Sequence, residues 1–551
     1  MSDALGKAAW SEEQGHWRYN PIRENGSPLQ GRFLLLGEAT NAPGFLHVRA
    51  PSRHMISIAP ARAGKGVSLI IPNLLNYRGA VLVVDPKGEN AWITAEFRRN
   101  VLGQKTVIVD PWGEVNSRYG SKVGVVESIA RFNPLSILKP GSDDYIEDLG
   151  YLADALIITE NTKDPYWEDT ARELWAGLMA FVVEHPDYAP TASLPLARKL
   201  LMQSNEALQG TIRTAIGLPP GSVAALKLAQ FDNPEKTTSI ASVIAVARSQ
   251  TAFLDSRVLS RSMETSDFSF DELCGGNISV YLVLPPDKLQ TYARWLRLMV
   301  SVGIRAVARC SGRAPNVPKP QAALGLPALF LLDEFGTIGR LKAVAEAYGH
   351  MARLGMIVWA FAQDLNQLRW HYPQHWETFI ANSQAVTCFG ITDNFTAEYI
   401  SKMLGTSTVE DTDISTSFSP SVQTTSRPRL LLNPDEVRGL SGELCLIMGP
   451  FAPILSRRII YHEDWDFLHR ARPDPEFPRT DAVRWRASQK RLGEMDSVAR
   501  RLKEYGYEAK ALGGGRWEVS GAPGKAPHIF ASENDLWRWM YVLVMDGLDQ
   551  A

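Results

Sequence analysis

The segment from Ile56 to Ser68 constrains the fold of this chain more than any other. An apolar run, which predicts a strand, leads into a loop of small residues, and a helical pattern follows. This order is typical of a phosphate-binding loop, in which backbone N–H groups and a helix N-terminus surround the phosphates of a nucleotide. We expect the phosphates to be bound by Pro60, Ala61, Arg62, Ala63, Gly64, Lys65, Gly66 and Val67.

Two residues of this loop depart from the general consensus. Ala59 stands at the position of the first glycine, and Gly66 replaces the Ser or Thr whose hydroxyl binds magnesium. Lys65 keeps its place, and we expect its ammonium to reach the outer phosphates as a point charge. The loop therefore predicts ATP binding, with a magnesium ion that relies on other ligands.

A second stretch, from Ala328 to Gly336, carries the complementary chemistry. An all-apolar strand ends in two neighbouring acids, which places two carboxylates at the carboxyl edge of a sheet. Asp333 is expected to hold Mg²⁺, directly or through water, and Glu334 to orient or deprotonate the attacking water. Gly-Lys pairs and strand-terminal acids also occur as turn and cap chemistry. Their combination, each in its own strand context, favours an ATPase.

Length and composition indicate a folded protein of two to four domains. The chain has 551 residues, of which 45% are hydrophobic and 21% charged. Because 58 basic side chains balance 60 acidic ones, any contact with nucleic acid must come from local patches rather than from the net charge.

The four cysteines, the apolar runs and the first residues all favour a cytosolic protein. Cys274, Cys310, Cys388 and Cys445 are widely spaced in mostly apolar surroundings, which predicts reduced core thiols. The most apolar long run, from Trp295 to Ala308, is interrupted by two arginines and is too short to span a bilayer. The first residues lack the pattern of a signal peptide.

Apolar strand patterns that alternate with helical patterns predict an α/β fold with a mainly parallel sheet. We expect a polar N-terminal segment (1–30), a RecA-like nucleotide-binding domain (31–143 and 263–471), an inserted all-α domain (144–262) and a small C-terminal α+β module (472–551). Strand patterns are missing from the predicted insert, where helical patterns take over.

Three further segments have compositions of their own. Arg313 to Pro320 is a proline-rich loop, and Gly405 to Pro428 is predicted to be a long irregular segment, which is usually functional or disordered. The C-terminal module begins with a locally basic helical region. A solvated amphipathic helix is the favoured interpretation of that region, and phosphate contact is the alternative.

Six motifs together resemble one known family. They read A-P-A-R-A-G-K-G-V-S-L-I-I-P-N-L-L, V-V-D-P-K-G-E-N-A-W-I-T-A, D-P-Y-W-E-D-T-A-R-E-L, L-L-D-E-F-G-T-I-G-R-L, A-F-A-Q-D-L-N-Q-L and A-E-Y-I-S-K-M-L-G-T-S-T-V. Over about Gly44 to Glu463 the chain resembles the type IV secretion and conjugation coupling proteins, that is, TraG/TraD-like DNA-transfer ATPases. Loops of this family often read Gly-Lys-Gly, so Gly66 fits the group.

The resemblance implies a ring of six subunits with ATP between neighbours, and an isolated chain that can be monomeric. Gln363 matches the position that senses the γ-phosphate, with a polar strand-end cap as the alternative. Arg353 matches an arginine that reaches the neighbour's nucleotide, and Arg340 is second in line. For either arginine, a solvated charge on a helix face is the competing interpretation.

The implied function is an ATP-driven coupling protein, with ATP and Mg²⁺ as cofactors, that brings single-stranded DNA, a relaxase–DNA complex or secreted proteins to the components of a type IV secretion channel. The family usually begins with a membrane anchor, and the sequence offers no candidate for one. We therefore expect a cytoplasmic protein, peripheral at the inner face of the bacterial inner membrane. Three arrangements are open: a separate membrane subunit docks the ATPase as a further partner, the ATPase works as a soluble shuttle, or the chain was trimmed before Met1. The alternatives are a ring-forming DNA pump outside secretion and a nucleotide-dependent substrate adaptor with little hydrolysis.

Overall fold

A computed structural model describes most of the central part of the chain. The described residues are 18–19, 33–38, 45–49, 53–158, 165–233, 237–312, 326–351, 354–415, 421–468, 470–475, 508–513, 516–520 and 528–530. The chain divides into two compact units. Unit 1 comprises 1–51, 58–78 and 384–551, and unit 2 comprises 52–57 and 79–383. These limits differ from the domain limits expected from the sequence, which stay predictions.

Unit 2 contains a parallel sheet, as the apolar runs predicted. Its strands lie in the order β4 (His54–Ile58), β9 (Met356–Ala362), β8 (Ala328–Leu332), β5 (Val81–Asp85), β7 (Ile278–Val283) and β6 (Lys105–Val109). The pairs from β9 to β6 are all parallel. Strands β4, β5, β7, β8 and β9 are buried along their whole length, which explains why they read as continuous apolar runs.

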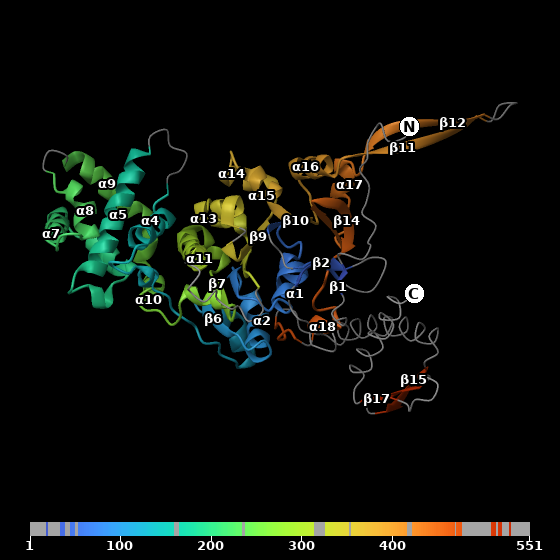
Figure 1. The fold of residues 1–551 in the computed structure, drawn as a ribbon, viewed down its shortest axis with the longest axis horizontal. Helices are drawn as coiled ribbons and strands as arrows, with labels where there is room; N and C mark the ends of the chain where they lie inside the picture. The colour runs from blue at the N-terminus through green and yellow to red at the C-terminus, as the bar shows by residue number, and fades with distance from the viewer. Residues whose placement is uncertain are drawn as a thin grey trace. The chain divides into compact units, whose positions relative to one another are not determined.

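Helices connect the strands of this sheet and complete its α/β architecture (Figure 1). They are α2 (Glu89–Asn100), α3 (Ser121–Val123), α11 (Leu289–Gly312), α12 (Phe335–Ile338), α13 (Lys342–Glu346), α14 (Leu365–His371) and α15 (Trp376–Ala381). Single turns of π-helix lie at Asn116–Gly120 and Ala347–Met351, and short 3₁₀ turns at Pro134–Ile137, Ala252–Asp255, Phe270–Gly275 and Pro286–Lys288.

A group of helices in unit 2 accounts for the region that the sequence predicted to be all-α (Figure 1). Its members are α4 (Tyr145–Leu156), α5 (Tyr166–Glu184), α6 (Leu194–Leu201), α7 (Asn205–Ile216), α8 (Val223–Leu228), α9 (Thr237–Gln250) and α10 (Arg257–Ser262), with 3₁₀ turns at Ala189–Thr191 and Ala229–Phe231. Helix α5 is central, because α4, α6, α8 and α9 all pack against it. Its residues Leu174, Leu178 and Phe181 are fully buried in this core.

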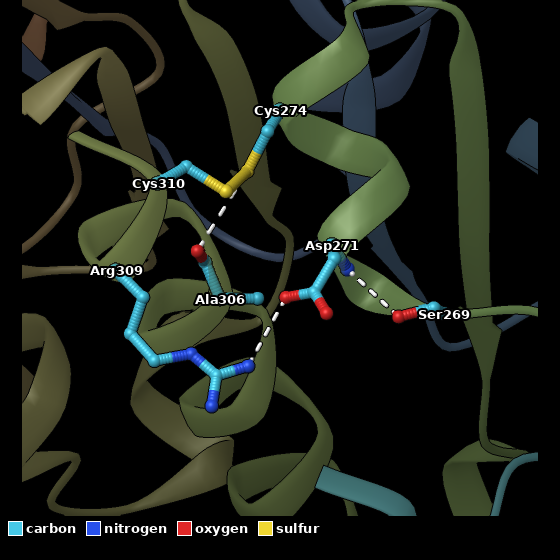
Figure 2. Close-up of a disulfide and its surroundings, with 6 residues drawn as sticks. All are labelled: Ser269, Asp271, Cys274, Ala306, Arg309 and Cys310. Atoms are coloured by element: carbon cyan, nitrogen blue, oxygen red, sulfur yellow. Dashed lines mark hydrogen bonds and ion pairs between the residues drawn. A yellow bond between two sulfur atoms is a disulfide. The ribbon is translucent and has the colours of Figure 1, made fainter. Parts of the chain in front are cut away.

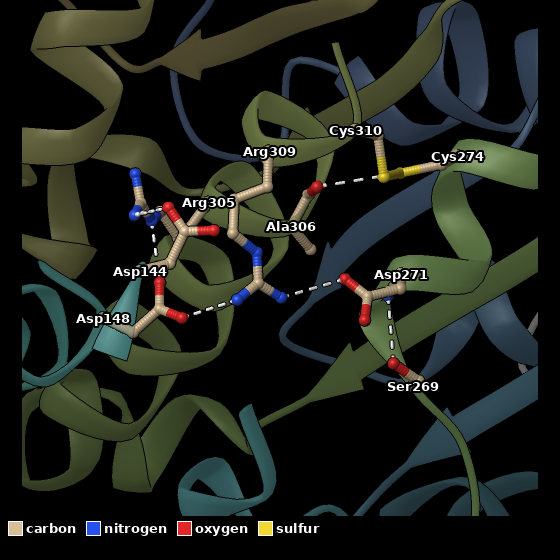
Figure 3. Close-up of polar contacts among 9 residues, drawn as sticks. All are labelled: Asp144, Asp148, Ser269, Asp271, Cys274, Arg305, Ala306, Arg309 and Cys310. Carbon is tan, nitrogen blue, oxygen red and sulfur yellow. Dashed lines mark hydrogen bonds and ion pairs between the residues drawn. A yellow bond between two sulfur atoms is a disulfide. The ribbon is translucent and has the colours of Figure 1, made fainter. Parts of the chain in front are cut away.

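One buried carboxylate ties the helical group to the helix that packs on the parallel sheet. Asp148 of α4 accepts hydrogen bonds from Arg305 (2.9 Å) and Arg309 (2.5 Å) of α11. Arg309 also donates to Asp271 (3.1 Å), and Arg305 lies 3.6 Å from Asp144. Figure 3 shows Asp148 between the two guanidinium groups. Asp148 thus faces two positive charges, which meets the condition for burying a carboxylate.

The expectation of four reduced thiols is wrong for two of the cysteines. Cys274, in the turn Phe270–Gly275, and Cys310, near the end of α11, form a disulfide (Figure 2). The Cys274 sulfur also lies 3.7 Å from the Ala306 carbonyl oxygen. Packing of α11 against this turn brings two cysteines separated by 36 residues together, and spacing alone cannot reveal that. Cys388 and Cys445 are buried free thiols, as expected.

Unit 1 contains antiparallel strands in the order β1 (Arg18–Tyr19), β3 (Phe45–Arg49), β2 (Phe33–Glu38), β14 (Phe451–Arg457), β13 (Leu444–Gly449) and β10 (Ser383–Cys388). All neighbouring strands in this order pair antiparallel. The unit also contains the π-helical turn η2 (Gly66–Ile70) and the helices α1 (Ile71–Leu74), α16 (Asn394–Leu404), α17 (Pro434–Arg438) and α18 (Trp465–Leu468).

The segment predicted to be irregular, Gly405 to Pro428, contains regular structure. Strands β11 (Thr406–Ser415) and β12 (Ser421–Leu430) pair in one antiparallel ladder, from Thr406 opposite Leu430 to Ser415 opposite Ser421 (Figure 1). The prediction was wrong because the stretch is rich in Ser and Thr and lacks apolar alternation. Threonine is nevertheless a good strand former, because its β-branched side chain suits a pleated surface.

Within the expected C-terminal module, the structure describes a small antiparallel sheet. It consists of β15 (Glu508–Gly513), β16 (Arg516–Ser520) and β17 (His528–Phe530). The basic helical region predicted before it and the proline-rich loop after Arg313 lie outside the described residues. Among the helices that the structure does describe, none combines the length and the apolar character needed to cross a bilayer.

Candidate nucleotide site

The glycine-lysine loop of unit 1 turns sharply before its helix. Arg62 and Gly64 both have positive φ angles, 61° and 91°. The Ala63 N–H donates to the Pro60 carbonyl (3.2 Å), and the Ser68 N–H donates to the Gly64 carbonyl (2.9 Å). The helical turns η2 and α1 then follow directly, so the predicted order of loop and helix is present. A left-handed Arg62 is an unfavourable conformation of the kind that clusters at ligand sites.

Lys65 is buried inside this loop. Its Nζ donates to the carbonyl oxygens of Ala59 (3.0 Å) and Pro60 (3.3 Å), which hold the ammonium within the turn. A Cβ added to Gly66 would meet no atom within 4 Å, so packing does not require a glycine at position 66. The loop thus offers backbone donors and one lysine charge, and the side chain at position 66 supplies no metal ligand.

The acid pair of unit 2 lies where the sequence predicted it, directly after β8. The Glu334 N–H donates to the Asp333 carboxylate (2.9 Å), and Glu334 has a φ of 53°, in the left-handed region. Such a conformation in a residue other than glycine costs of order 1–3 kcal/mol and is retained where the surroundings fix it. The turn therefore holds the acid pair directly after β8.

Gln363, which follows β9, contacts the same acid pair. Its Nε2 donates to the Glu334 carboxylate (2.7 Å). The start of α14 holds Gln363 in place, because its backbone N–H donates to Gln367 (3.4 Å) and Asp364 caps the helix through the Gln367 N–H (2.7 Å). The structure therefore brings together two of the predicted catalytic residues, Glu334 and Gln363, at adjacent strand ends.

Asp85 is a further member of this edge that the sequence prediction missed. Val84 pairs with Leu332, so Asp85 and Asp333 lie at the ends of neighbouring parallel strands. Burial raises the pKa of Asp85 to about 7, and the charges of Glu89 and Asp333 act in the same direction, while hydrogen bonds from Ala91 and Asn90 oppose the rise. The signal was available, because Asp85 follows an apolar strand as Asp333 does.

The structure describes one of the two candidate arginines, Arg340. Arg353 lies outside the described residues. Arg340 is exposed and lines a cavity of about 570 Å³ in unit 2, which is also lined by Arg172, Arg297 and Glu346.

The residues present fit a nucleotide and a magnesium ion. Carboxylate oxygens such as those of Asp333 suit Mg²⁺, which usually takes one or two protein carboxylates and completes its shell with phosphate oxygens and waters. In the part of the chain that is described, no cluster of three or more His, Cys, Asp or Glu side chains is arranged to hold a metal ion. The positive loop around Lys65 suits phosphate groups.

A parallel α/β sheet with acids at its strand ends, together with a Gly-Lys loop, defines a P-loop nucleotide-binding protein. The chain belongs to the family described as type IV secretory system conjugative DNA transfer, which it matches over residues 2–484. This match confirms the resemblance inferred from the motifs, and it identifies the chain as a type IV coupling protein.

Individual relatives agree with this assignment. The conjugal transfer protein TraG of Escherichia coli is 26% identical over 454 residues, which cover 76% of this chain and 68% of TraG. The type IV secretion system-coupling protein VirD4 of Bartonella quintana is 25% identical over 434 residues, covering 76% of this chain and 64% of VirD4. Protein VirD4 of Agrobacterium fabrum is 27% identical over 434 residues, 75% and 59% of the two chains.

Solved structures share the fold. The bacterial conjugative coupling protein TrwBdeltaN70, in its unbound monoclinic form, superposes with a TM-score of 0.57 at 16% identity, covering 83% of this chain and 95% of TrwB. TrwB in complex with the non-hydrolysable ATP analogue ADPNP gives a TM-score of 0.56 at 15% identity, covering 83% and 96%. At this identity the similarity shows the fold, which confirms the predicted α/β class.

Proposed function

We propose that this coupling protein is an ATP-driven translocase that delivers DNA, a relaxase–DNA complex or proteins to a type IV secretion channel. The hydrogen bond from Gln363 to Glu334 is the observation that carries the proposal. It joins an acid that can activate water to an amide that can respond to the γ-phosphate, as hydrolysis requires. Relatives named for conjugal transfer and for coupling to secretion support the role.

Each residue of the site then has one task. The loop from Pro60 to Val67 binds the phosphates through its backbone, and Lys65 neutralises the outer ones. Asp333 holds the magnesium ion, which supplies charge to the phosphates, and Asp85 supports it from the neighbouring strand end. Glu334 orients and deprotonates the attacking water. The solved TrwB complexes with ADPNP and with ADP and Mg²⁺ support these cofactors.

The proposed motor works as a ring of six chains, in which Arg353 or Arg340 of one subunit completes the site of its neighbour. A cation supplied across a subunit boundary stabilises the charge that develops on the transferred phosphoryl group. The partners are the channel components, a relaxase with single-stranded DNA or secreted proteins, and a membrane subunit at the inner face of the bacterial membrane.

Steady-state ATP hydrolysis, measured with and without single-stranded DNA, tests the proposal. A motor is expected to hydrolyse ATP, and to do so faster when DNA is present. Tight ATP binding without turnover under both conditions would instead favour a nucleotide-dependent adaptor. Glu334→Gln is the matched variant, because it keeps the shape of the side chain and removes its charge. It should bind ATP and fail to hydrolyse it.

A further inference from the structure

Arg458, which follows strand β14 of unit 1, contacts the glycine-lysine loop from a distant part of the sequence. Its Nε and Nη2 both donate to the Ser68 hydroxyl oxygen, at 3.0 and 2.7 Å, across a separation of 390 residues. Ser68 is buried and belongs to η2, the turn that begins directly after Lys65. The side chain of Arg458 is thus attached to the helix on which the phosphate-binding loop ends.

Two further contacts fix the plane of the Arg458 guanidinium. Its Nη1 donates to the Gly442 carbonyl (2.6 Å), and its central carbon lies 4.6 Å from the ring centroid of the buried Phe389. The Arg458 backbone N–H donates to the Glu443 carbonyl (2.8 Å), so the backbone and the side chain of Arg458 bind neighbouring residues, Glu443 and Gly442. A group with these restraints has one orientation and adds little entropy cost when a ligand binds.

The guanidinium also approaches the loop itself. A Cβ built on Gly64 would clash with Nη2, and Gly64 has a φ of 91°. Glycine is favoured at this position by the positive φ, and the absence of a Cβ leaves room for the Arg458 guanidinium. The positive charge of Arg458 lies against the residue that precedes Lys65, in the segment expected to surround phosphates.

From these contacts we propose that Arg458 is a positioning residue for the nucleotide phosphates. It sets the backbone of Gly64 through Ser68 from outside the loop, and it adds a second fixed charge beside Lys65. Three of its five N–H groups are used in the hydrogen bonds to Ser68 and Gly442, and its planar face is used on Phe389. A lysine ammonium lacks the forked N–H donors and the planar face of a guanidinium, so lysine cannot reproduce this arrangement.

The inference rests on the proposed nucleotide site, and binding of a fluorescent ADP analogue to the full chain tests both separately. Arg458→Lys and Arg458→Gln are each expected to raise the Kd by at least about tenfold. ATPase kinetics of the same variants should show a raised KM with kcat changed less than about threefold, because Arg458 positions the loop and does not take part in hydrolysis. Arg457→Lys is the control, since the neighbouring Arg457 side chain is exposed, and it should behave as wild type.

Thermal unfolding separates positioning from a purely structural role. At least one of the two Arg458 variants should keep its unfolding midpoint within about 3 °C of wild type while the Kd rises. Wild-type nucleotide binding by both variants would overturn the inference, and so would a weakened Kd that appears only where far-UV circular dichroism shows lost structure. If wild type and Lys65→Ala bind the analogue equally weakly, the proposed nucleotide site itself is wrong.

Discussion

The Gln363 amide donates a 2.7 Å hydrogen bond to the Glu334 carboxylate, so the ends of β9 and β8 are linked at the residues proposed for catalysis. Glu334 reaches this partner from a left-handed backbone conformation, which its surroundings must hold. A bond of this kind keeps the carboxylate oriented, and it can also break when Gln363 turns toward a phosphate. In the proposed function, this pair connects the state of the nucleotide to the position of the base.

Removing the Gln363 amide should slow hydrolysis and leave nucleotide affinity nearly unchanged. We expect Gln363→Ala to lower kcat by about tenfold or more, and Glu334→Gln to lower it by about a hundredfold or more, since a positioned general base contributes 10²- to 10⁴-fold. Gln374→Ala is a control on an exposed glutamine of unit 2. If Gln363→Ala raised KM and left kcat intact, Gln363 would be a binding residue and not a sensor.

The Cys274–Cys310 disulfide should be detectable by counting thiols. In protein purified without reductant and then unfolded, two of the four cysteines, Cys388 and Cys445, should react with a thiol reagent, and all four after reduction. In the folded protein Cys388 and Cys445 should react slowly, because burial raises the pKa of Cys445 to about 12 and that of Cys388 well above its usual value.

The same disulfide should stabilise the fold. It closes a loop between residues 36 apart, for which the chain-entropy relation gives roughly 3–4 kcal/mol of unfolding free energy. Cys310→Ser should therefore lower the denaturation midpoint, and added reductant should lower the wild type to the same value. Four reactive thiols in the unreduced protein would contradict the pairing.

Asp148 should be among the most sensitive polar positions of unit 2. Asp148→Asn leaves the guanidinium groups of Arg305 and Arg309 without their shared carboxylate, and breaking a buried ion pair from one side costs about 3–5 kcal/mol. Equilibrium denaturation of the full chain measures the change. Asp143→Asn, on the surface five residues earlier, serves as the control and should change the unfolding free energy by less than about 0.5 kcal/mol. Equal stability of the two variants would show that the cluster is not important for folding.

His54 should make the stability of unit 2 depend on pH. Its Nδ1 accepts a hydrogen bond from the Val358 N–H (3.0 Å), and its Nε2 donates to the Ala347 carbonyl (2.7 Å), so the neutral ring is used on both sides. Burial lowers its pKa from 6.5 to about 4, although the bond to Ala347 opposes this. The unfolded chain therefore takes up the proton first. Stability contributed by the neutral ring is complete above pH 6.5 and falls by about 3 kcal/mol as the pH drops to 4.

Because Asp85, whose pKa is raised to about 7, changes stability in the opposite direction over this range, the test compares wild type with His54→Asn at each pH. The difference in unfolding free energy between the two proteins should shrink between pH 6.5 and pH 4, because the wild type loses the stability contributed by neutral His54. A constant difference across this window would show that His54 titrates normally.

The sequence predicted the parallel sheet and the order of loop and helix around Lys65 because their signals are local. The strands β5, β8 and β9 are buried along their whole length and are apolar except for Asp85 at the end of β5. Asp333 and Gln363 directly follow β8 and β9. The direction of β10 and β13 in unit 1 could not be inferred, because an apolar run does not encode parallel or antiparallel pairing.

The features that were missed depend on contacts between distant residues. The hydrogen bond from Arg458 to Ser68 joins residues that are 390 positions apart in the sequence. In the sequence, Arg458 is one of two consecutive arginines at the end of a strand, and nothing local distinguishes it from Arg457. The Cys274–Cys310 pairing likewise needs the packing of α11 on its neighbouring turn. Asp85 is the exception, since its strand-end position was visible and only its closeness to Asp333 required the sheet order.

The most direct test of the account is the rate of Mg²⁺-dependent ATP hydrolysis by Lys65→Ala, measured beside wild type and Lys139→Ala. Lys65 is buried in the loop and Lys139 is exposed in unit 2, so only the first should matter. We predict that Lys65→Ala lowers turnover by about a hundredfold or more, because the charge on the outer phosphates is lost, and that Lys139→Ala hydrolyses ATP as wild type does. Wild-type turnover by Lys65→Ala would contradict the assignment of the ATPase site.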